Sequence, residues 1–146
     1  MNKKKKLREQ AEHYGSYALR SPDAAEAVMA ELKRLSIAES TQFAWFYYNF
    51  VPTAMLIGAD YIPAEIGDII SPPEIFDRTR YAKTWGLPEG YVALSSGEGE
   101  GFVLYKISTE EVFDVGVEEF PKLEACEVKP IFNTFLDFML SYTAVR

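Results

Sequence analysis

Cysteine and histidine each occur only once in the chain, and this scarcity excludes several kinds of site. Cys126 has no second thiol for an internal disulfide, and it suits a reducing compartment. Because His13 is the only histidine, a nucleophilic triad would have to draw its base from the basic N-terminal segment. Ser95 and Ser96 lie in no Gly-x-Ser-x-Gly elbow. We therefore expect neither a serine or cysteine hydrolase nor a zinc site.

Long apolar runs are also lacking. No stretch approaches the roughly 20 apolar residues that a membrane-spanning helix needs. The basic start is not followed by an apolar segment, since Leu7 leads into Arg8, Glu9 and Gln10, so no secretory signal peptide is predicted. We expect a cytoplasmic protein that does not associate with membranes.

Positive charge is scarce outside the first eight residues. The chain holds 22 acidic and 15 basic residues, and five of the basic ones are Lys3, Lys4, Lys5, Lys6 and Arg8. The rest of the chain therefore carries 22 acids against 10 bases, a balance of −12. Such a body repels nucleic acid and attracts basic partners. Residues 1–8 are predicted to form a solvated, frayed tail, because a block of like charges is more often a disordered end than a nucleic-acid site.

What the chain does contain is the composition of one globular domain. With 146 residues, 48% of them hydrophobic and 14% aromatic, it can bury roughly two thirds of its unfolded surface. A single domain over residues 1–146 is predicted. Most of the aromatic side chains are expected in its core.

Helical periodicity marks the N-terminal third. A first helix is predicted up to about Leu19, and a second begins after Ser21, where Pro22 suits a first helical position. A third helix capped by Ser40 or Thr41 carries an apolar face. That face is made by Phe43, Phe46, Tyr47 and Phe50. It is typical of core packing rather than of a cofactor site. Residues 54–70 predict one or two short strands.

Two further helices are predicted downstream. In the first, at about residues 72–85, Ser71 acts as the cap, Pro72 occupies the first helical position and Glu74 completes a capping box. Gly86 is available for its left-handed C-terminal cap. After an acidic, irregular segment over residues 118–128, a strongly apolar helix is expected at about residues 132–142.

The chain is organised around residues 86–117. Three runs rich in Val, Tyr, Phe and Ile alternate with short breakers, which predicts three consecutive antiparallel strands at about residues 91–117. In the middle strand, Val103 and Tyr105 would point to one face, and Phe102 and Leu104 to the other. The sheet should therefore be covered on both sides. The order of elements predicts an α+β domain with a mostly antiparallel sheet packed by N-terminal, middle and C-terminal helices.

The residue pattern of this stretch also resembles that of a known family. The pattern consists of Leu87-Pro88, a strand ending at Leu94-Ser95, a Gly-acid-Gly turn, Phe102 to Tyr105 and Val112-Phe113-Asp114. It is similar to that of the SUKH superfamily, which includes Smi/Knr-type regulators of cell-wall synthesis and bacterial immunity proteins. The resemblance implies the α+β fold and a role in protein binding. Immunity proteins of this type bind a cognate toxin, often a nuclease, and block it stoichiometrically.

Residues 97–101, Gly-Glu-Gly-Glu-Gly, could suggest a phosphate cradle. Their spacing is not that of a phosphate-binding loop, and two glutamates would repel the anion. The simpler interpretation is an exposed turn with positive φ. The functional interpretation is an acidic edge aimed at a basic partner. That edge would be formed by Glu98, Glu100, Asp114, Glu118 and Glu119.

Three functions are therefore weighed. An immunity protein that neutralises a basic toxin domain is the first hypothesis, and a regulatory interaction module without a toxin is the second. Paired carboxylates also leave open an acid–base enzyme such as a glycosidase. Trp45 and Trp85 fall on predicted helices, where core packing is the simpler interpretation than sugar stacking. No catalytic residue, cofactor or metal is predicted, and the sequence does not specify the oligomeric state.

Overall fold

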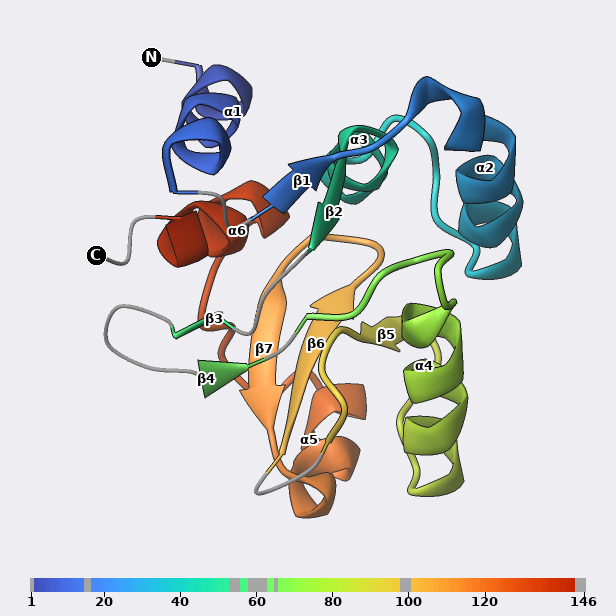
Figure 1. The fold of residues 1–146 in the computed structure, drawn as a ribbon. Coiled ribbons are helices and arrows are strands. Elements are labelled where there is room, and N and C mark those ends of the chain that lie inside the picture. The colour runs from blue at the N-terminus through green and yellow to red at the C-terminus, as the bar shows by residue number, and fades with distance from the viewer. Residues whose placement is uncertain are drawn as a thin grey trace.

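The structure, a computed structural model, describes residues 2–14, 17–52, 56–57, 63–64, 66–97 and 101–143. It confirms an α+β fold in which helices surround small antiparallel sheets (Figure 1). None of the helices in these ranges has the length and apolar composition that crossing a lipid bilayer requires.

The predicted three-stranded meander is confirmed. It consists of β5 (Tyr91–Ala93), β6 (Phe102–Lys106) and β7 (Val112–Val115), with β6 in the centre. Both pairings are antiparallel, and the register places Val92 opposite Tyr105 and Leu104 opposite Phe113. Because side chains alternate along a strand, each face of this sheet receives its own set of apolar residues.

Both faces are covered, as predicted for the middle strand. On one face, Val103 and Tyr105 belong to the main core, which also contains helices α3 (Gln42–Asn49) and α6 (Phe135–Thr143). On the other face, Phe102 and Leu104 join a smaller core with the end of α4 (Glu74–Thr84) and with α5 (Phe120–Glu124). Each buried apolar side chain contributes about 1.5–3 kcal/mol.

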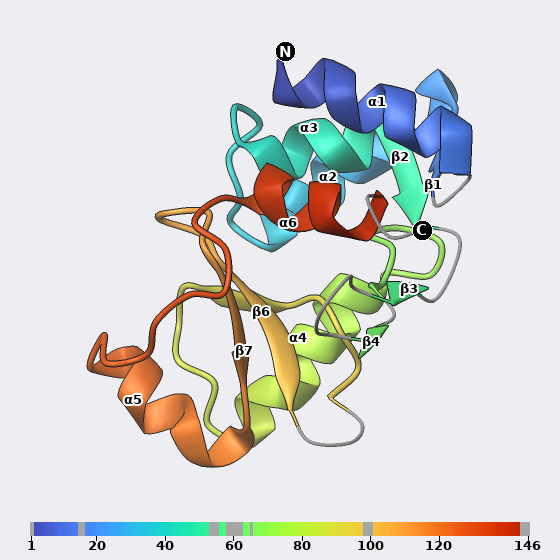
Figure 2. The same cartoon turned by 90° about the vertical axis from the view of Figure 1, so that its left-hand side faces the viewer.

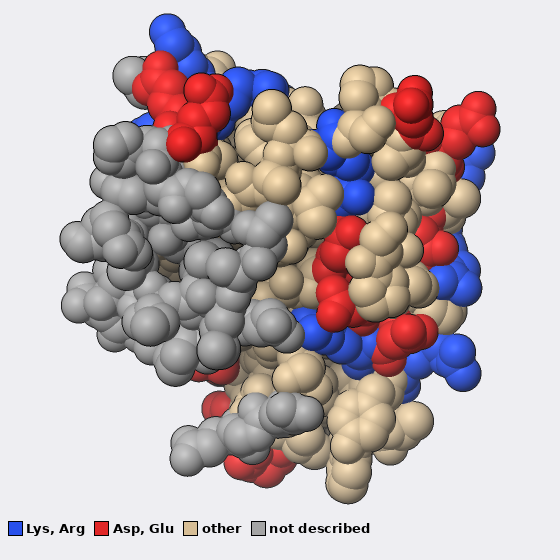
Figure 3. Space-filling model, viewed as in Figure 1, with Lys and Arg blue, Asp and Glu red and all other residues tan. Residues whose placement is uncertain are grey.

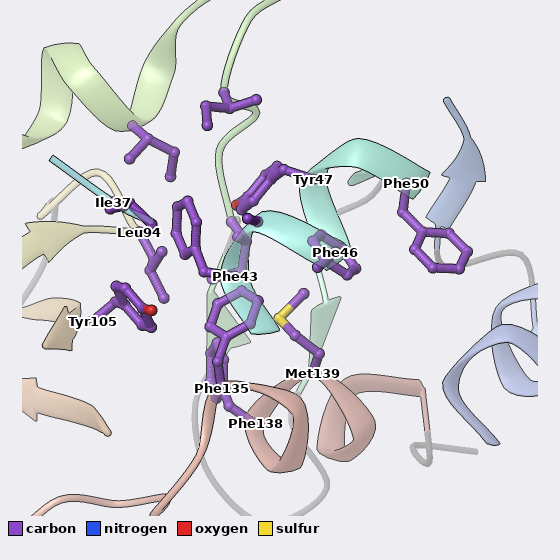
Figure 4. Close-up of a cluster of buried hydrophobic side chains, with 14 of the residues drawn as sticks. Ile37, Phe43, Phe46, Tyr47, Phe50, Leu94, Tyr105, Phe135, Phe138 and Met139 are labelled. Carbon is purple, nitrogen blue, oxygen red and sulfur yellow. The ribbon is translucent and has the colours of Figure 1, made fainter. Parts of the chain in front are cut away.

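Aromatic rings fill the main core. The ring of Phe43 from α3 lies 4.7 Å from that of Tyr105 in β6 and 5.2 Å from that of Phe135 in α6 (Figure 4). Thr41 caps α3 as predicted, since its hydroxyl accepts a hydrogen bond from Ala44 N–H. The carboxylate of Glu110 accepts two more amides of this helix start, so the β6–β7 turn is tied to α3.

The prediction of a first helix up to about Leu19 is wrong. Helix α1 (Lys3–Tyr14) ends earlier, and β1 (Tyr17–Leu19) pairs antiparallel with β2 (Phe50–Pro52). Tertiary contacts decide this, because the buried Tyr17 ring packs edge-on against Phe46 at 5.0 Å.

The basic run is not a frayed tail. Lys3 to Lys6 and Arg8 lie in α1, whose Leu7 is fully buried, and α1 packs against α6 (Figure 2). The side chain of Lys3 pairs with Asp137 at 2.9 Å. The apolar side chain within the run explains the order, because it anchors the helix while the lysines stay in solvent.

The second helix was predicted to begin after Ser21, and the structure agrees: the 3₁₀ turn η1 (Pro22–Ala24) leads into α2 (Ala25–Arg34). Within residues 54–70, the short strands β3 (Leu56–Ile57) and β4 (Pro63–Ala64) pair antiparallel. These residues meet the expectation of early strands.

Helix α4 begins at Glu74 rather than at about residue 72, and Ser71 makes no capping hydrogen bond there. The carboxylate of Glu74 instead accepts the Asp68 amide at 2.7 Å, so the predicted capping box is wrong. The C-terminal prediction is confirmed, because Gly86 has φ +102° directly after the helix ends.

Two predictions near the C-terminus need correction. The segment over residues 118–128 is not irregular throughout, because it contains the 3₁₀ turn η2 (Val117–Glu119) and helix α5. Phe120 and Leu123, three residues apart, both bury their side chains and hold α5 on the sheet. The last helix begins at residue 135 rather than 132, because Phe132 forms a bridge with Val112 instead.

A buried ion pair connects the residue after β1 to the segment that precedes α4. Arg20 and Asp68 pair with side chains only 4% and 5% exposed. The guanidinium also donates to the backbone carbonyl of Phe50 at 3.0 Å and to that of Tyr47. We call Arg20 and Asp68 the buried pair.

Candidate functional site

The predicted acidic edge is brought together in part. Glu98 and Glu100 lie outside the described residues. Asp114 is exposed on β7, and Glu118 and Glu119 follow on η2. Partial desolvation by neighbouring groups raises the pKa of Asp114, and the nearby negative charge of Glu119 raises it further. Three of the five predicted acids therefore lie near the end of β7.

The three acids are not equally available. The Glu119 carboxylate accepts the Gly116 amide at 3.1 Å and so stabilises the start of η2. Glu118 is exposed, and Asp114 projects into solvent between buried neighbours on β7. A basic partner would meet Asp114 and Glu118 first, and Glu119 would contribute its charge while holding the turn.

Two exposed aromatic side chains at the C-terminal end of α4 form a second feature. Tyr81 is 53% exposed and Trp85 is 55% exposed, and their ring centroids lie 6.3 Å apart in an edge-to-face arrangement. We call them the aromatic pair. Both side chains lie outside the buried face of the helix, which is formed by Ile75, Thr79 and Ala82.

The expectation that Trp85 packs in the core is therefore wrong, whereas Trp45 does pack against the main core. Sequence reasoning missed the aromatic pair although a signal was present. Tyr81 and Trp85 are four residues apart, so they share one side of the helix, and neither belongs to the buried set at positions 75, 79 and 82. Exposed aromatic residues of this size are enriched in protein interfaces.

The aromatic pair and the acids lie at the same end of the molecule. Figures 1 and 2 place the C-terminal end of α4, β7 and α5 at the lower end, and α1 at the upper end. The charge over α4 is mixed, since blue and red side chains alternate with tan ones in the lower right of Figure 3. The lower end thus offers aromatic area flanked by charged groups.

A third feature is a hollow of about 320 Å³ beside α4. It lies between the end of α2, one flank of α4, β5 and the turn after β6. Three cationic residues line it, Arg34, Arg80 and Lys83, together with Phe76, Tyr91 and one acidic residue, Glu89. We call it the cationic hollow. No sequence motif indicated it, because its residues come from separate segments.

The most deeply buried charges do not form an accessible site. The Arg20 and Asp68 side chains are used within the fold, and the Ser71 amide donates to Asp68 at 3.2 Å. Burial and the negative charge of Asp68 raise the pKa of the Tyr47 hydroxyl well above its ordinary value, and this hydroxyl donates to the Gly67 carbonyl at 2.9 Å. These groups join the end of β1, helix α3 and the segment before α4, so their role is structural.

Within the ranges that the structure describes, no three His, Cys, Asp or Glu side chains converge as metal ligands would. Comparisons of the chain with protein-family models, curated proteins and solved structures gave no match.

Proposed function

We propose that the chain is a non-catalytic immunity protein that neutralises a cognate basic toxin domain, of the nuclease class, by stoichiometric binding. The observation that carries the proposal is the aromatic pair, because Tyr81 and Trp85 expose more than half of their surface on one helix. Truncating aromatic anchors of this kind commonly costs about 2–4 kcal/mol of binding free energy. The resemblance of residues 86–115 to the SUKH pattern supports the same role.

The charge of the chain supports a basic partner. Its formal charge is −7, and Asp114 and Glu118 are exposed at the end of the molecule that also carries the aromatic pair. Acidic groups around an anchor raise the association rate and select positively charged partners. The single, exposed Cys126 fits a protein that acts in the reducing cytoplasm, where a nuclease toxin would be met.

The test is reconstitution with the toxin domain encoded beside the gene. We expect a 1:1 complex on gel filtration and loss of toxin activity at equimolar amounts. Trp85→Ala and Tyr81→Ala should each weaken binding by about 30-fold or more, in keeping with anchor truncation. Their free energies of unfolding should stay within about 0.5 kcal/mol of the parent, because both side chains are exposed.

Leu19→Ala is the matched control, because Leu19 is a 67% exposed apolar residue on β1, away from the lower end. It should leave affinity unchanged. If no complex forms and toxicity persists, the immunity proposal fails. If instead a partner that is not a toxin is bound through Trp85, the regulatory-module alternative replaces it.

The proposed role of the exposed acidic residues in attracting a basic partner has its own test. Asp114→Asn combined with Glu118→Gln should slow association and reduce its dependence on salt, with little change in dissociation. Glu12→Gln combined with Glu26→Gln removes the same charge from exposed positions on α1 and α2. Equal effects of the two double variants would show that only the total charge matters. On binding, the raised pKa of Asp114 should fall, because a nearby cation favours the carboxylate.

A further inference from the structure

The cationic hollow combines positively charged and apolar lining residues. Arg34 ends α2, whereas Arg80 and Lys83 come from α4. Val92 and Ile107 contribute apolar surface to the lining. We propose that this hollow binds a small anion, a carboxylate or phosphate group carried on an apolar or aromatic stem.

Two of the three cations lie against the same aromatic ring. The Arg34 guanidinium lies 3.5 Å from the centroid of Phe76, and that of Arg80 lies 5.6 Å from the same centroid. The ring attracts each cation, but the two guanidinium groups repel each other. An anion between them removes this repulsion and accepts hydrogen bonds from both.

These cations are also available, unlike the arginine of the buried pair. Among the described residues, Arg80 has no carboxylate within ion-pairing distance. The contact of Lys83 with Glu89 is long, at 3.4 Å, and the Glu89 side chain is 90% exposed. Arg34 pairs with Glu31 at 2.9 Å but remains 44% exposed, and a guanidinium has five N–H donors. Each cation therefore retains donors for a ligand.

The dimensions and lining define the ligand class. A volume of about 320 Å³ is at the lower end for small-molecule sites. It accommodates one ring or short aliphatic stem with its anionic group. Phe76 and Tyr91 supply aromatic surface for such a stem, and Ser36 and Ser108 are also among the lining residues. The two sources of such a group are a free organic acid or phosphate and an acidic side chain next to an apolar residue in a peptide.

The site is separate from the aromatic pair. Phe76 and Lys83 lie on the flank of α4 that faces α2 and β5, whereas Tyr81 and Trp85 do not line the hollow. The inference therefore does not depend on the proposed function. Loss of anion binding with retained toxin binding, or the reverse, would separate the two.

The experiment is an amide NMR titration of the ¹⁵N-labelled full chain with phenyl phosphate and with 3-phenylpropionate. The neutral 3-phenylpropionamide serves as the matched probe. We expect shifts at the amides of Ser36, Gly90 and Ser108, and at least about tenfold tighter binding of the anions than of the amide. Acetyl-Phe-Glu-amide tests the peptide source. Tighter binding of this peptide than of the free anions assigns the ligand to a protein, and the opposite order assigns it to a small molecule.

Variants locate the effect. Arg80→Gln should weaken anion binding about tenfold, and Arg80→Lys should restore part of it, because lysine keeps the charge without the planar donor fork. Lys5→Gln removes the same charge from an exposed position of α1 and should change nothing. A two-dimensional amide spectrum confirms that each variant is folded. Equal affinity for the anions and the amide, or unchanged anion binding in folded Arg80→Gln, would overturn the proposal.

Discussion

Two groups of arginines in this molecule have opposite roles. The Arg20 side chain is 4% exposed and donates hydrogen bonds to Asp68 and to two backbone carbonyls, so its role is structural. Arg34 and Arg80 lie against Phe76 at the rim of the hollow, and Arg80 meets no carboxylate in the described part of the chain. Burial with complete pairing marks a structural charge, whereas exposure with free donors marks a charge that is available for binding.

The largest expected effect comes from breaking the buried pair. Asp68→Ala leaves the Arg20 guanidinium buried without its counter-charge, which should lower the free energy of unfolding by about 3–5 kcal/mol. Urea denaturation measures this loss. Asp77→Ala removes an exposed carboxylate from α4 and should change stability by less than about 0.5 kcal/mol. Similar losses of unfolding free energy in both variants would show that the buried carboxylate contributes no more to stability than an exposed one.

Glu110 lies between the buried and the exposed charges, because its side chain is half-buried and its carboxylate accepts several hydrogen bonds. It accepts the amides of Gln42 and Phe43 at 3.2 Å each and the Tyr105 hydroxyl at 2.9 Å. Glu110→Gln removes the negative charge from the start of α3 and should cost about 1–2 kcal/mol by urea denaturation.

The neighbouring Glu111→Gln is the control for that measurement. Its carboxylate accepts only the exposed Thr109 hydroxyl among the contacts described, so the expected change is below about 0.5 kcal/mol. An equal loss in both variants would show that the contact of Glu110 with α3 contributes nothing of its own.

The smallest effect is expected at the surface pair of Lys3 and Asp137, whose side chains are 49% and 37% exposed. Burial alone would raise the pKa of Asp137, but hydrogen bonds from Lys3 and Thr134 lower it below its ordinary value. A lowered carboxyl pKa stabilises the fold above the pKa of the unfolded chain, and this contribution is lost as the pH falls through the folded pKa.

Solvent screening keeps the contribution of the surface pair below about 0.5 kcal/mol. Asp137→Asn should therefore lose only this amount at pH 7, and the difference from the parent should shrink as the pH falls through the lowered pKa of Asp137. Thermal denaturation at pH 7 and over a series of acidic pH values checks it. A difference that grows on acidification would contradict the sign of the shift.

The local features of the fold were predictable from the sequence. Alternating apolar residues predicted the meander and its two covered faces, and Thr41 and Gly86 marked helix ends that the structure confirms. These signals depend on near neighbours in the chain. The start of α4 was mispredicted because the Glu74 carboxylate accepts the Asp68 amide, while the Asp68 carboxylate pairs with Arg20 from a distant part of the chain.

The candidate site divides in the same way. Asp114, Glu118 and Glu119 were identified as acids on and after the last strand, and the Tyr81–Trp85 spacing was readable on a helix although it was overlooked. The cationic hollow was not readable at all. Arg34 and Arg80 are 46 positions apart by their numbers and meet only at Phe76.

The sequence alone therefore determined the α+β class, the central meander, the acidic body and a few helix boundaries, such as the start of α3 and the end of α4. It could do so because hydrophobic periodicity, capping and net charge act over a few residues or over the whole composition. The tertiary structure decided the pairing of β1 with β2, the burial of Arg20 against Asp68 and the meeting of three cations at the hollow. The physical reason is that burial and charge pairing depend on which distant segments pack together, and no local pattern records that.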